Sequence, residues 1–271
     1  HELCYAVSDH PDEGYRYGGT VVDIADIYLD GRTEKDAVNP LGNTHGSIEN
    51  INGEWYVFYH RQTNRTNFSR QGCAEKIRMD ADGTIHQAEV TSCGLNPGPL
   101  RGEGKYPAYI CCHLTGKEGA VDSQPLSMQM RFPYLTQDIP DIEPETQEAE
   151  EDAGFPVQYV ANVGDGAAVG YKYFQCCGTA VRWLTVRGNA KGIIQVRTTP
   201  GGDVCGEIPI RMQDLQARQK QAEQAAFRDG LWKQLETDVE IPDGKHALYF
   251  IFHGTGTFDL AEFELGSIKD G

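Results

Sequence analysis

Short apolar runs separated by turn residues are the feature that most constrains the fold of this chain. Residues 47–52 and 54–60 flank the dipeptide Asn52-Gly53, and residues 73–79 and 84–90 flank the turn 80–83. Asn-Gly between two alternating apolar runs is a strong signal for a β-hairpin. The 31 Gly and 13 Pro residues provide many more turns of this kind. The pattern predicts an all-β protein that begins with consecutive hairpins. Such hairpins are typical of propeller blades and of β-sandwiches.

The β pattern returns in the C-terminal half, after residue 155. About eight runs with strand character follow one another there, which is typical of a β-sandwich. We expect strands at residues 158–162, 170–175, 181–187, 192–198, 205–210, 237–241, 246–252 and 257–265. One segment differs: residues 214–227 are rich in helix-forming Gln, Ala, Lys and Glu, with Asp214 as an N-cap, so we expect a short helical insertion.

The charge of the chain narrows the choice of partners. The sequence has 24 Lys and Arg against 40 Asp and Glu, a net charge of −16 at neutral pH. This charge excludes nucleic acid and anionic membranes as favourable partners, because both are negatively charged. No apolar run reaches the roughly 20 residues that a membrane-spanning helix needs. Acidic residues without Lys or Arg concentrate between 138 and 152, so residues 137–154 are interpreted as an acidic linker.

The eight cysteines indicate thiols in the reduced state. Cys111-Cys112 and Cys176-Cys177 are sequence neighbours, which makes a disulfide within either pair strained. The absence of a Cys-x-x-Cys pair argues against a structural zinc site. No signal peptide is visible in this chain, and a bacterial location in the cytoplasm or outside the cell stays open. Because strand character begins almost at His1, we expect the chain to be a fragment or a processed product.

Motifs in the N-terminal half resemble glycoside hydrolase family 43. They are Asn43-Thr44-His45-Gly46-Ser47-Ile48, Gly53–Arg61, Ser69-Arg70-Gln71-Gly72-Cys73 and Asp82–Ile85, with a further likeness in Glu2–Asp9 and Gly18-Gly19. The resemblance covers residues 1–136. It implies the last blades of a five-bladed β-propeller, from an inverting enzyme that acts on arabinose- or xylose-containing plant polysaccharides. The activity it implies is that of an α-L-arabinofuranosidase or a β-xylosidase.

The same resemblance assigns roles to two residues. His45 matches a histidine near the propeller axis, where the family holds a structural calcium ion or a water cluster, so it is both a candidate metal ligand and a candidate substrate-binding residue. Arg70 matches an arginine that reaches the bound sugar, a task for which a guanidinium fork is suited. The alternatives are a histidine satisfied within its turn and an arginine with a structural role. His60 and Arg61 are interpreted as structural.

The catalytic carboxylates do not match any residue here. Inverting hydrolysis requires a general acid and a general base roughly 6.5–9.5 Å apart. By the resemblance, the family's catalytic Asp and Glu would align before His1, and Glu2, Asp9 and Glu49 do not occupy their positions. We therefore expect the acid and the base upstream of His1.

Residues 155–266 resemble a family 6 carbohydrate-binding module, and we interpret residues 155–271 as that domain. The resemblance rests on Asn162–Gly166, Val169–Phe174, Gly230–Trp232, Gly244–Phe250 and Phe252–Leu260. It implies that Tyr159 and Trp232 stack on a sugar ring and that Asp259 stands where the family usually has Asn. An apolar sugar face packs well on an aromatic ring. Two alternatives remain: a non-catalytic fragment that binds xylan or arabinoxylan, and a degenerate module that only braces the propeller. Tyr171, Tyr173 and Phe174 are interpreted as core residues of the sandwich. The partners that the resemblance implies are plant cell-wall polysaccharides, namely arabinoxylan, xylan and arabinan.

Overall fold

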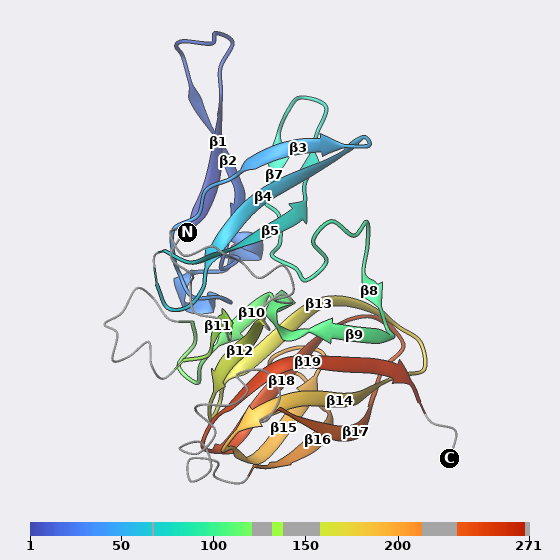
Figure 1. Cartoon of the computed structure of the whole chain (residues 1–271). Coiled ribbons are helices and arrows are strands. Elements are labelled where there is room, and N and C mark those ends of the chain that lie inside the picture. Colours follow the sequence, from blue (N-terminus) through green and yellow to red (C-terminus); the bar gives the residue numbers. More distant parts are fainter. Residues whose placement is uncertain (67, 121–131, 138–157, 213–231, 269–271) are drawn as a thin grey trace, which may run out of the picture.

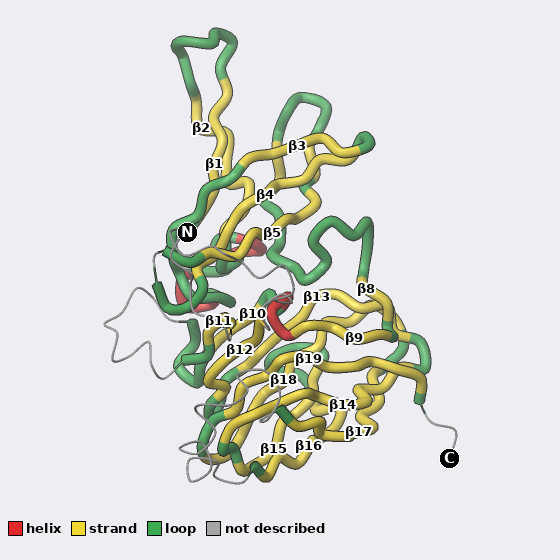
Figure 2. The backbone as a smooth tube through the Cα atoms, in the orientation of Figure 1, coloured by secondary structure: helices red, strands yellow, loops and turns green. Residues whose placement is uncertain are grey.

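The computed structural model describes residues 1–66, 68–120, 132–137, 158–212 and 232–268 (Figure 1). In this part of the chain nearly all regular structure is strand, and helix is limited to three short 3-10 turns (Figure 2). The turns are η1 (Leu29–Gly31), η2 (Glu34–Asp36) and η3 (Ala108–Ile110). None of the described helices is long and apolar enough to cross a membrane. The predicted all-β fold class is confirmed.

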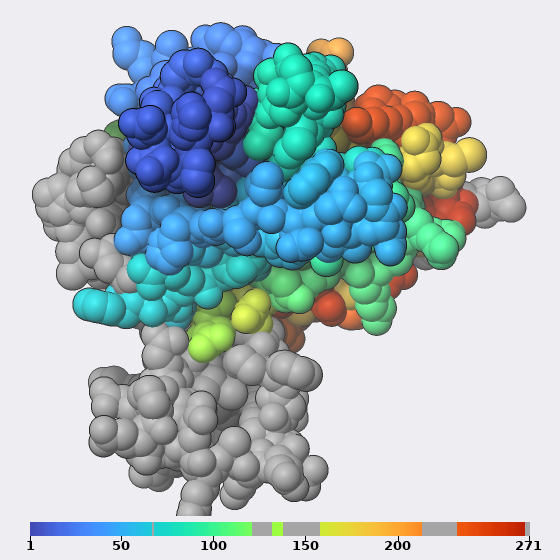
Figure 3. Space-filling model, turned by 90° about the horizontal axis from the view of Figure 1, so that it is seen from above, coloured from blue at the N-terminus to red at the C-terminus, as the bar shows by residue number. Residues whose placement is uncertain are grey.

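Three small antiparallel sheets form the N-terminal part. The first pairs β1 (Glu2–Val7) with β2 (Arg16–Asp23), the second orders β3 (Ser47–Ile51), β4 (Glu54–Gln62) and β5 (Arg70–Lys76), and the third pairs β6 (Arg78–Met79) with β7 (Ile85–His86). Seen from above, these sheets lie side by side over the C-terminal part (Figure 3). The first and third sheets are two-stranded hairpins, and the second has three strands.

The hairpin β3–β4 turns at the predicted dipeptide. Asn52 and Gly53 have φ angles of 53° and 88°, the left-handed conformation that a two-residue hairpin turn requires and that Asn and Gly tolerate best. Val57 and Tyr59 of β4 then pack into a cluster with Val21 and Val22 of β2. This cluster joins the small sheets to one another.

The predicted hairpin 73–79/84–90 forms only at its turn. β6 and β7 have two residues each. The preceding run instead forms β5, which pairs with β4 in the register Tyr59 opposite Cys73. The following run turns to β2, where the Ala88 amide donates to the Val21 carbonyl at 2.8 Å. The hairpin is short because the backbone groups on both sides of it bind other strands.

The C-terminal part is a sandwich of two six-stranded sheets. One sheet has the order β10-β13-β18-β15-β16, with β8 on β13; the other has the order β11-β12-β19-β14-β17, with β9 on β19. The long strands are β12 (Gln158–Val163), β13 (Ala168–Cys176), β14 (Thr179–Gly188), β15 (Lys191–Arg197), β16 (Val204–Arg211), β17 (Lys233–Ile241), β18 (Gly244–Thr255) and β19 (Phe258–Ser267). These correspond to the strands predicted from the sequence.

An aromatic core lies between the two sheets. Its largest fully buried side chains include Tyr171, Phe174, Phe250, Phe258 and Phe263. Tyr171 and Phe174 were predicted to lie there. Tyr173, the residue between them in the predicted core set, points the other way, and its hydroxyl donates to Glu89 of the N-terminal part at 2.9 Å.

Four short strands that precede residue 138 belong to the sandwich sheets. They are β8 (Leu100–Arg101), β9 (Gly104–Pro107), β10 (His113–Thr115) and β11 (Tyr134–Gln137). They pair with β13, β19, β13 and β12 respectively. The boundary predicted from sequence between residues 136 and 137 therefore cuts through β11, which is hydrogen-bonded to β12 of the sandwich. The short strands pair there because the long strands leave backbone groups at their edges open. The predicted helix at 214–227 and nearly all of the acidic linker lie outside the described residues.

Buried charged groups join the two parts. The Lys172 ammonium of β13 lies 3.0 Å from the Asp26 carboxylate and 2.8 Å from Glu89. Lys172 and Asp26 are almost fully buried. Arg32 also donates to Asp26, at 3.0 Å. A buried ion pair of this kind is stable only when further hydrogen bonds satisfy both groups, as they do here.

Glu75 is a buried carboxyl group of the N-terminal part, close to these charged groups. Its oxygens accept bonds from the Thr91 amide (2.7 Å) and the Thr91 hydroxyl (2.6 Å), and from the Tyr59 hydroxyl (3.3 Å). Burial nevertheless raises the pKa of Glu75 to about 8, because desolvation disfavours the charged form. Glu75 is thus protonated at neutral pH in the folded protein.

This raised pKa predicts a pH-dependent stability. The folded chain holds the Glu75 proton more tightly than the unfolded chain, so the contribution of Glu75 to the free energy of unfolding falls as the pH rises from about 4.5 to about 8. We expect a loss of a few kcal/mol, at about 1.4 kcal/mol for each pH unit in this window. In Glu75→Gln the amide reproduces the neutral group, so the fall should be much smaller. Urea unfolding at several pH values measures it. The exposed Glu54→Gln variant should keep the wild-type slope, and an unchanged slope in Glu75→Gln would contradict the assignment.

Candidate functional site

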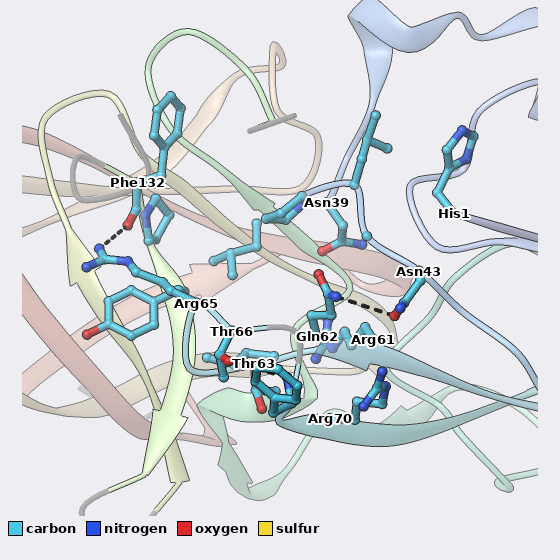
Figure 4. A pocket seen from close by; sticks show the side chains of 18 residues that line it. His1, Asn39, Asn43, Arg61, Gln62, Thr63, Arg65, Thr66, Arg70 and Phe132 are labelled. Atoms are coloured by element: carbon cyan, nitrogen blue, oxygen red, sulfur yellow. Dashed lines mark hydrogen bonds between the residues drawn. The ribbon is translucent and has the colours of Figure 1, made fainter. Parts of the chain in front are cut away.

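A cavity of about 1000 Å³ opens where β4 ends. Its walls come from residues 39–43, from the end of β4 and the loop that follows it, and from residues 132–135 at the start of β11 (Figure 4). The cavity thus lies between the N-terminal sheets and the sandwich. Arg70 lines it, and so do the polar side chains of Asn43, Gln62 and Thr63.

The predicted site residues His45 and Arg70 lie on either side of His60. The rings of His45 and His60 meet edge to face, with centroids 4.4 Å apart. Arg70 Nε donates to His60 Nε2 at 3.0 Å, and His60 Nδ1 lies 3.3 Å from the His45 carbonyl oxygen. His60, interpreted from sequence as structural, is the residue that holds the other two together.

The position of His45 follows from two neighbours in its motif. A side chain in place of Gly46 would collide with the carbonyl oxygen of Phe58 in β4, so only glycine allows this close approach. The Thr44 hydroxyl donates to the His60 carbonyl at 2.8 Å. The motif is therefore a segment fitted against the end of β4, with the His45 side chain exposed at the surface.

His60 is neutral in this arrangement. Its Nδ1 faces a carbonyl oxygen and must donate, whereas Nε2 accepts from Arg70. The pKa of His60 is lowered by burial, then by the neighbouring His45 and Arg70, all of which disfavour the imidazolium. A second proton on His60 would remove the acceptor that Arg70 uses. The imidazole therefore orients the Arg70 side chain only in its neutral form.

Metal binding at His45 finds little support in the residues around it. Calcium takes six to eight oxygen ligands, many of them carboxylates. The neighbours of His45 provide a second imidazole and, through His60, a guanidinium and the Asn43 amide oxygen. Across the described residues there is no group of three His, Cys, Asp or Glu that could hold a metal ion. These residues do not fit a calcium site by themselves, and the ion stays a prediction.

The described walls of the cavity contain no carboxylate. Arg61, Arg65 and Arg70 line it, together with amides, hydroxyls and apolar side chains, but neither Asp nor Glu does. Inverting hydrolysis requires two carboxyl groups. The described walls offer hydrogen-bond donors and acceptors but not these two carboxyl groups.

The predicted residues of the sandwich cleft also lie together. The rings of Tyr159 and Trp232 are 5.4 Å apart. A residue that the sequence reading missed, Arg187, places its guanidinium 4.4 Å from the centroid of each ring. Its Nε donates to Asp259 Oδ2 at 2.9 Å, and the other oxygen of Asp259 accepts the Asn162 amide. Arg187 thus occupies the faces on which a sugar ring would stack. Nothing in the alternating pattern of β14 marks it.

No protein-family model matches the chain. A curated protein described as a xylosidase/arabinosidase, from Thermoclostridium stercorarium, is 43% identical over 270 residues, which are 98% of this chain and 51% of that protein. The chain is similar to a xylosidase/arabinosidase. It spans about half the length of this relative.

Two solved structures show a weaker likeness. A family 43 arabinoxylan arabinofuranohydrolase from Bacillus subtilis, in complex with cellotetraose, has 19% identity and a TM-score of 0.48, over 98% of this chain and 47% of that one. A module named CsCBM6-3 from Clostridium stercorarium, in complex with cellobiose, has 14% identity and a TM-score of 0.39, over 63% of this chain and 98% of that one. Scores this low add no weight to the sequence match.

The packing of Arg187 predicts a stabilising role in the sandwich. Arg187→Ala removes the ion pair with Asp259 and two cation–π contacts, which are worth about 0.5–2 kcal/mol together at a partly buried site. The melting temperature should fall by a few degrees, since 1 kcal/mol corresponds to about 2–4 °C in a chain of this size. Thermal unfolding followed by circular dichroism measures it. Substitution of the exposed Arg211 by Ala should leave the melting temperature unchanged. Equal melting temperatures for both variants would contradict this packing.

Proposed function

We propose that the chain is part of a glycoside hydrolase that acts on arabinose- and xylose-containing plant polysaccharides. The activity would be that of an α-L-arabinofuranosidase or a β-xylosidase, with inversion at the sugar carbon. The observation that carries the proposal is the 43% identity to a xylosidase/arabinosidase over nearly the whole chain. The cavity supports it, because the family 43-like motifs and the cavity walls meet in the same place.

The side chains of the cavity suit a neutral sugar. Arg70 is exposed, and the only hydrogen bond of its side chain among the described residues is the one from Nε to His60. The terminal nitrogens therefore present N–H donors in a planar fork. Asn43 and Gln62 bond to each other at 3.3 Å and offer amide groups beside it. Such groups can donate to and accept from the hydroxyls of a pentose.

The acid and base carboxylates would come from outside the described part of this chain. This follows from the chemistry that inversion requires and from the absence of Asp and Glu among the described residues of the cavity walls. The role of this chain would be to bind and orient the substrate. His45 would help to hold the arginine through His60, and a calcium ion near it would need oxygen ligands from elsewhere.

A second proposal is that the chain is a non-catalytic carbohydrate-binding fragment that recognises xylan or arabinoxylan. Its family 6-like sandwich motivates it. The filling of the aromatic pair by Arg187 favours a bracing role for the sandwich over binding at that pair, so a sugar bound by this chain would lie in the cavity.

We expect the 271-residue chain to bind oligosaccharides without cleaving them. Calorimetry with arabinose-substituted xylo-oligosaccharides should show binding. Arg70→Ala should weaken it about tenfold or more, because a hydrogen bond to a charged donor contributes about 1.5–3 kcal/mol. Nitrophenyl arabinofuranoside and nitrophenyl xyloside should not be hydrolysed.

The exposed arginine Arg78 of β6, which does not line the cavity, provides the matched control. Arg78→Ala should bind like the wild type. Equal affinities for the Arg70→Ala and wild-type chains would remove the cavity as the binding site. Turnover of either nitrophenyl substrate by this chain would show that it contains its own acid and base.

A further inference from the structure

Phe68 is the most exposed large hydrophobic side chain in the described structure, with 91% of its surface accessible. A single exposed aromatic residue is common on protein surfaces and needs no explanation by itself. Phe68 differs because it lines the same cavity as Arg70, on the loop that joins β4 to β5. Its exposure therefore occurs at the place where the proposed function requires a ligand.

Hydrogen bonds at the base of the loop hold it in this conformation. The Thr63 amide donates to the Ser69 carbonyl at 3.0 Å, and the Thr63 and Ser69 hydroxyls are 2.7 Å apart. The Asn64 side chain donates to the Ser69 hydroxyl at 2.9 Å. The Phe68 amide itself donates to the Thr66 hydroxyl at 3.3 Å. These bonds tie the two ends of the loop together, and the phenyl ring lies outside the buried apolar clusters.

The other walls of the cavity have the mixed character that sugars require. Phe132, Pro133 and Leu41 add apolar surface. Figure 4 shows Gln62, Thr63 and Thr66 together in the middle of the cavity wall, with Phe132 on one side and Arg70 on the other. A sugar ring has apolar C–H faces and a polar rim of hydroxyls, so it is matched by an aromatic face bordered by amides and hydroxyls.

We propose that Phe68 is the stacking platform for a pentose ring of the polysaccharide main chain, next to the sugar unit that Arg70 binds. The inference rests on the proposed function and makes it more specific. Arg70 and the amides recognise hydroxyls of one unit, and Phe68 selects ligands that are long enough to place a second ring on its face. The phenyl ring is already exposed in the described structure, so the ordering cost of stacking on it is small.

Calorimetry on the 271-residue chain with an arabinose-substituted xylopentaose tests the proposal. Phe68→Ala should weaken binding about tenfold, and Phe68→Trp should bind at least as tightly as the wild type, because tryptophan retains a stacking face. The matched control is Tyr17→Ala, since Tyr17 of β2 is a 71% exposed aromatic residue away from the cavity. It should bind like the wild type. Because Phe68 is exposed, its substitution should not alter the melting temperature.

Two outcomes overturn the inference in different ways. If Arg70→Ala weakens binding and Phe68→Ala does not, the platform is wrong and the proposed function stands. If the unmodified chain binds no oligosaccharide, the inference fails with the binding role of the cavity. The proposed hydrolase is then judged separately, by whether a longer protein that contains these residues releases arabinose or xylose.

Discussion

The buried guanidinium of Arg61 is the interaction on which the site depends. Arg61 stands at the end of β4 and donates to the Gln71 side chain (2.8 Å) and to the carbonyls of Cys111 (2.6 Å) and Tyr109 (2.8 Å). A buried charge is costly unless its donors are satisfied. Here neutral oxygen atoms of three residues accept the hydrogen bonds. The same contacts fix the end of β4 against the segment that enters the sandwich, where the cavity lies. The structural role inferred for Arg61 from sequence agrees with these contacts.

The ion pair of Lys172 and Asp26 also joins the N-terminal part to the sandwich. Because Asp26 also accepts the Val90 amide at 2.7 Å and Arg32 at 3.0 Å, the carboxylate has several donors and the ammonium is not left alone in an apolar setting. Two buried cations thus link the two parts: Arg61 of the N-terminal part bonds the segment that enters the sandwich, and Lys172 of the sandwich bonds Asp26. The geometry of the cavity is then a property of the seam, since neither part alone provides all of its walls.

Much of the fold could be predicted because its signals are local. The Asn52-Gly53 turn and the eight long strands of the sandwich follow from turn chemistry and from alternating apolar residues. The strands β8 to β11 could not be predicted, since runs of two to four residues carry no period and form only because a distant strand offers an open edge. Arg187 escaped for a related reason. Its partners Tyr159, Trp232 and Asp259 are far from it in the sequence and meet it only in the folded sandwich.

Arg70 and Arg187 stand at the two predicted sugar sites and make different contacts. The guanidinium of Arg187 is fixed on both aromatic rings and on a carboxylate whose two oxygens are engaged. A sugar ring would have to displace this guanidinium in order to stack on the same ring faces. Arg70 contacts a neutral imidazole through one nitrogen and directs its remaining donors outward. Sequence resemblance predicted a sugar site at both places. In the described structure the guanidinium of Arg187 lies on the two rings predicted to stack on a sugar, whereas the side chain of Arg70 is exposed on the cavity wall.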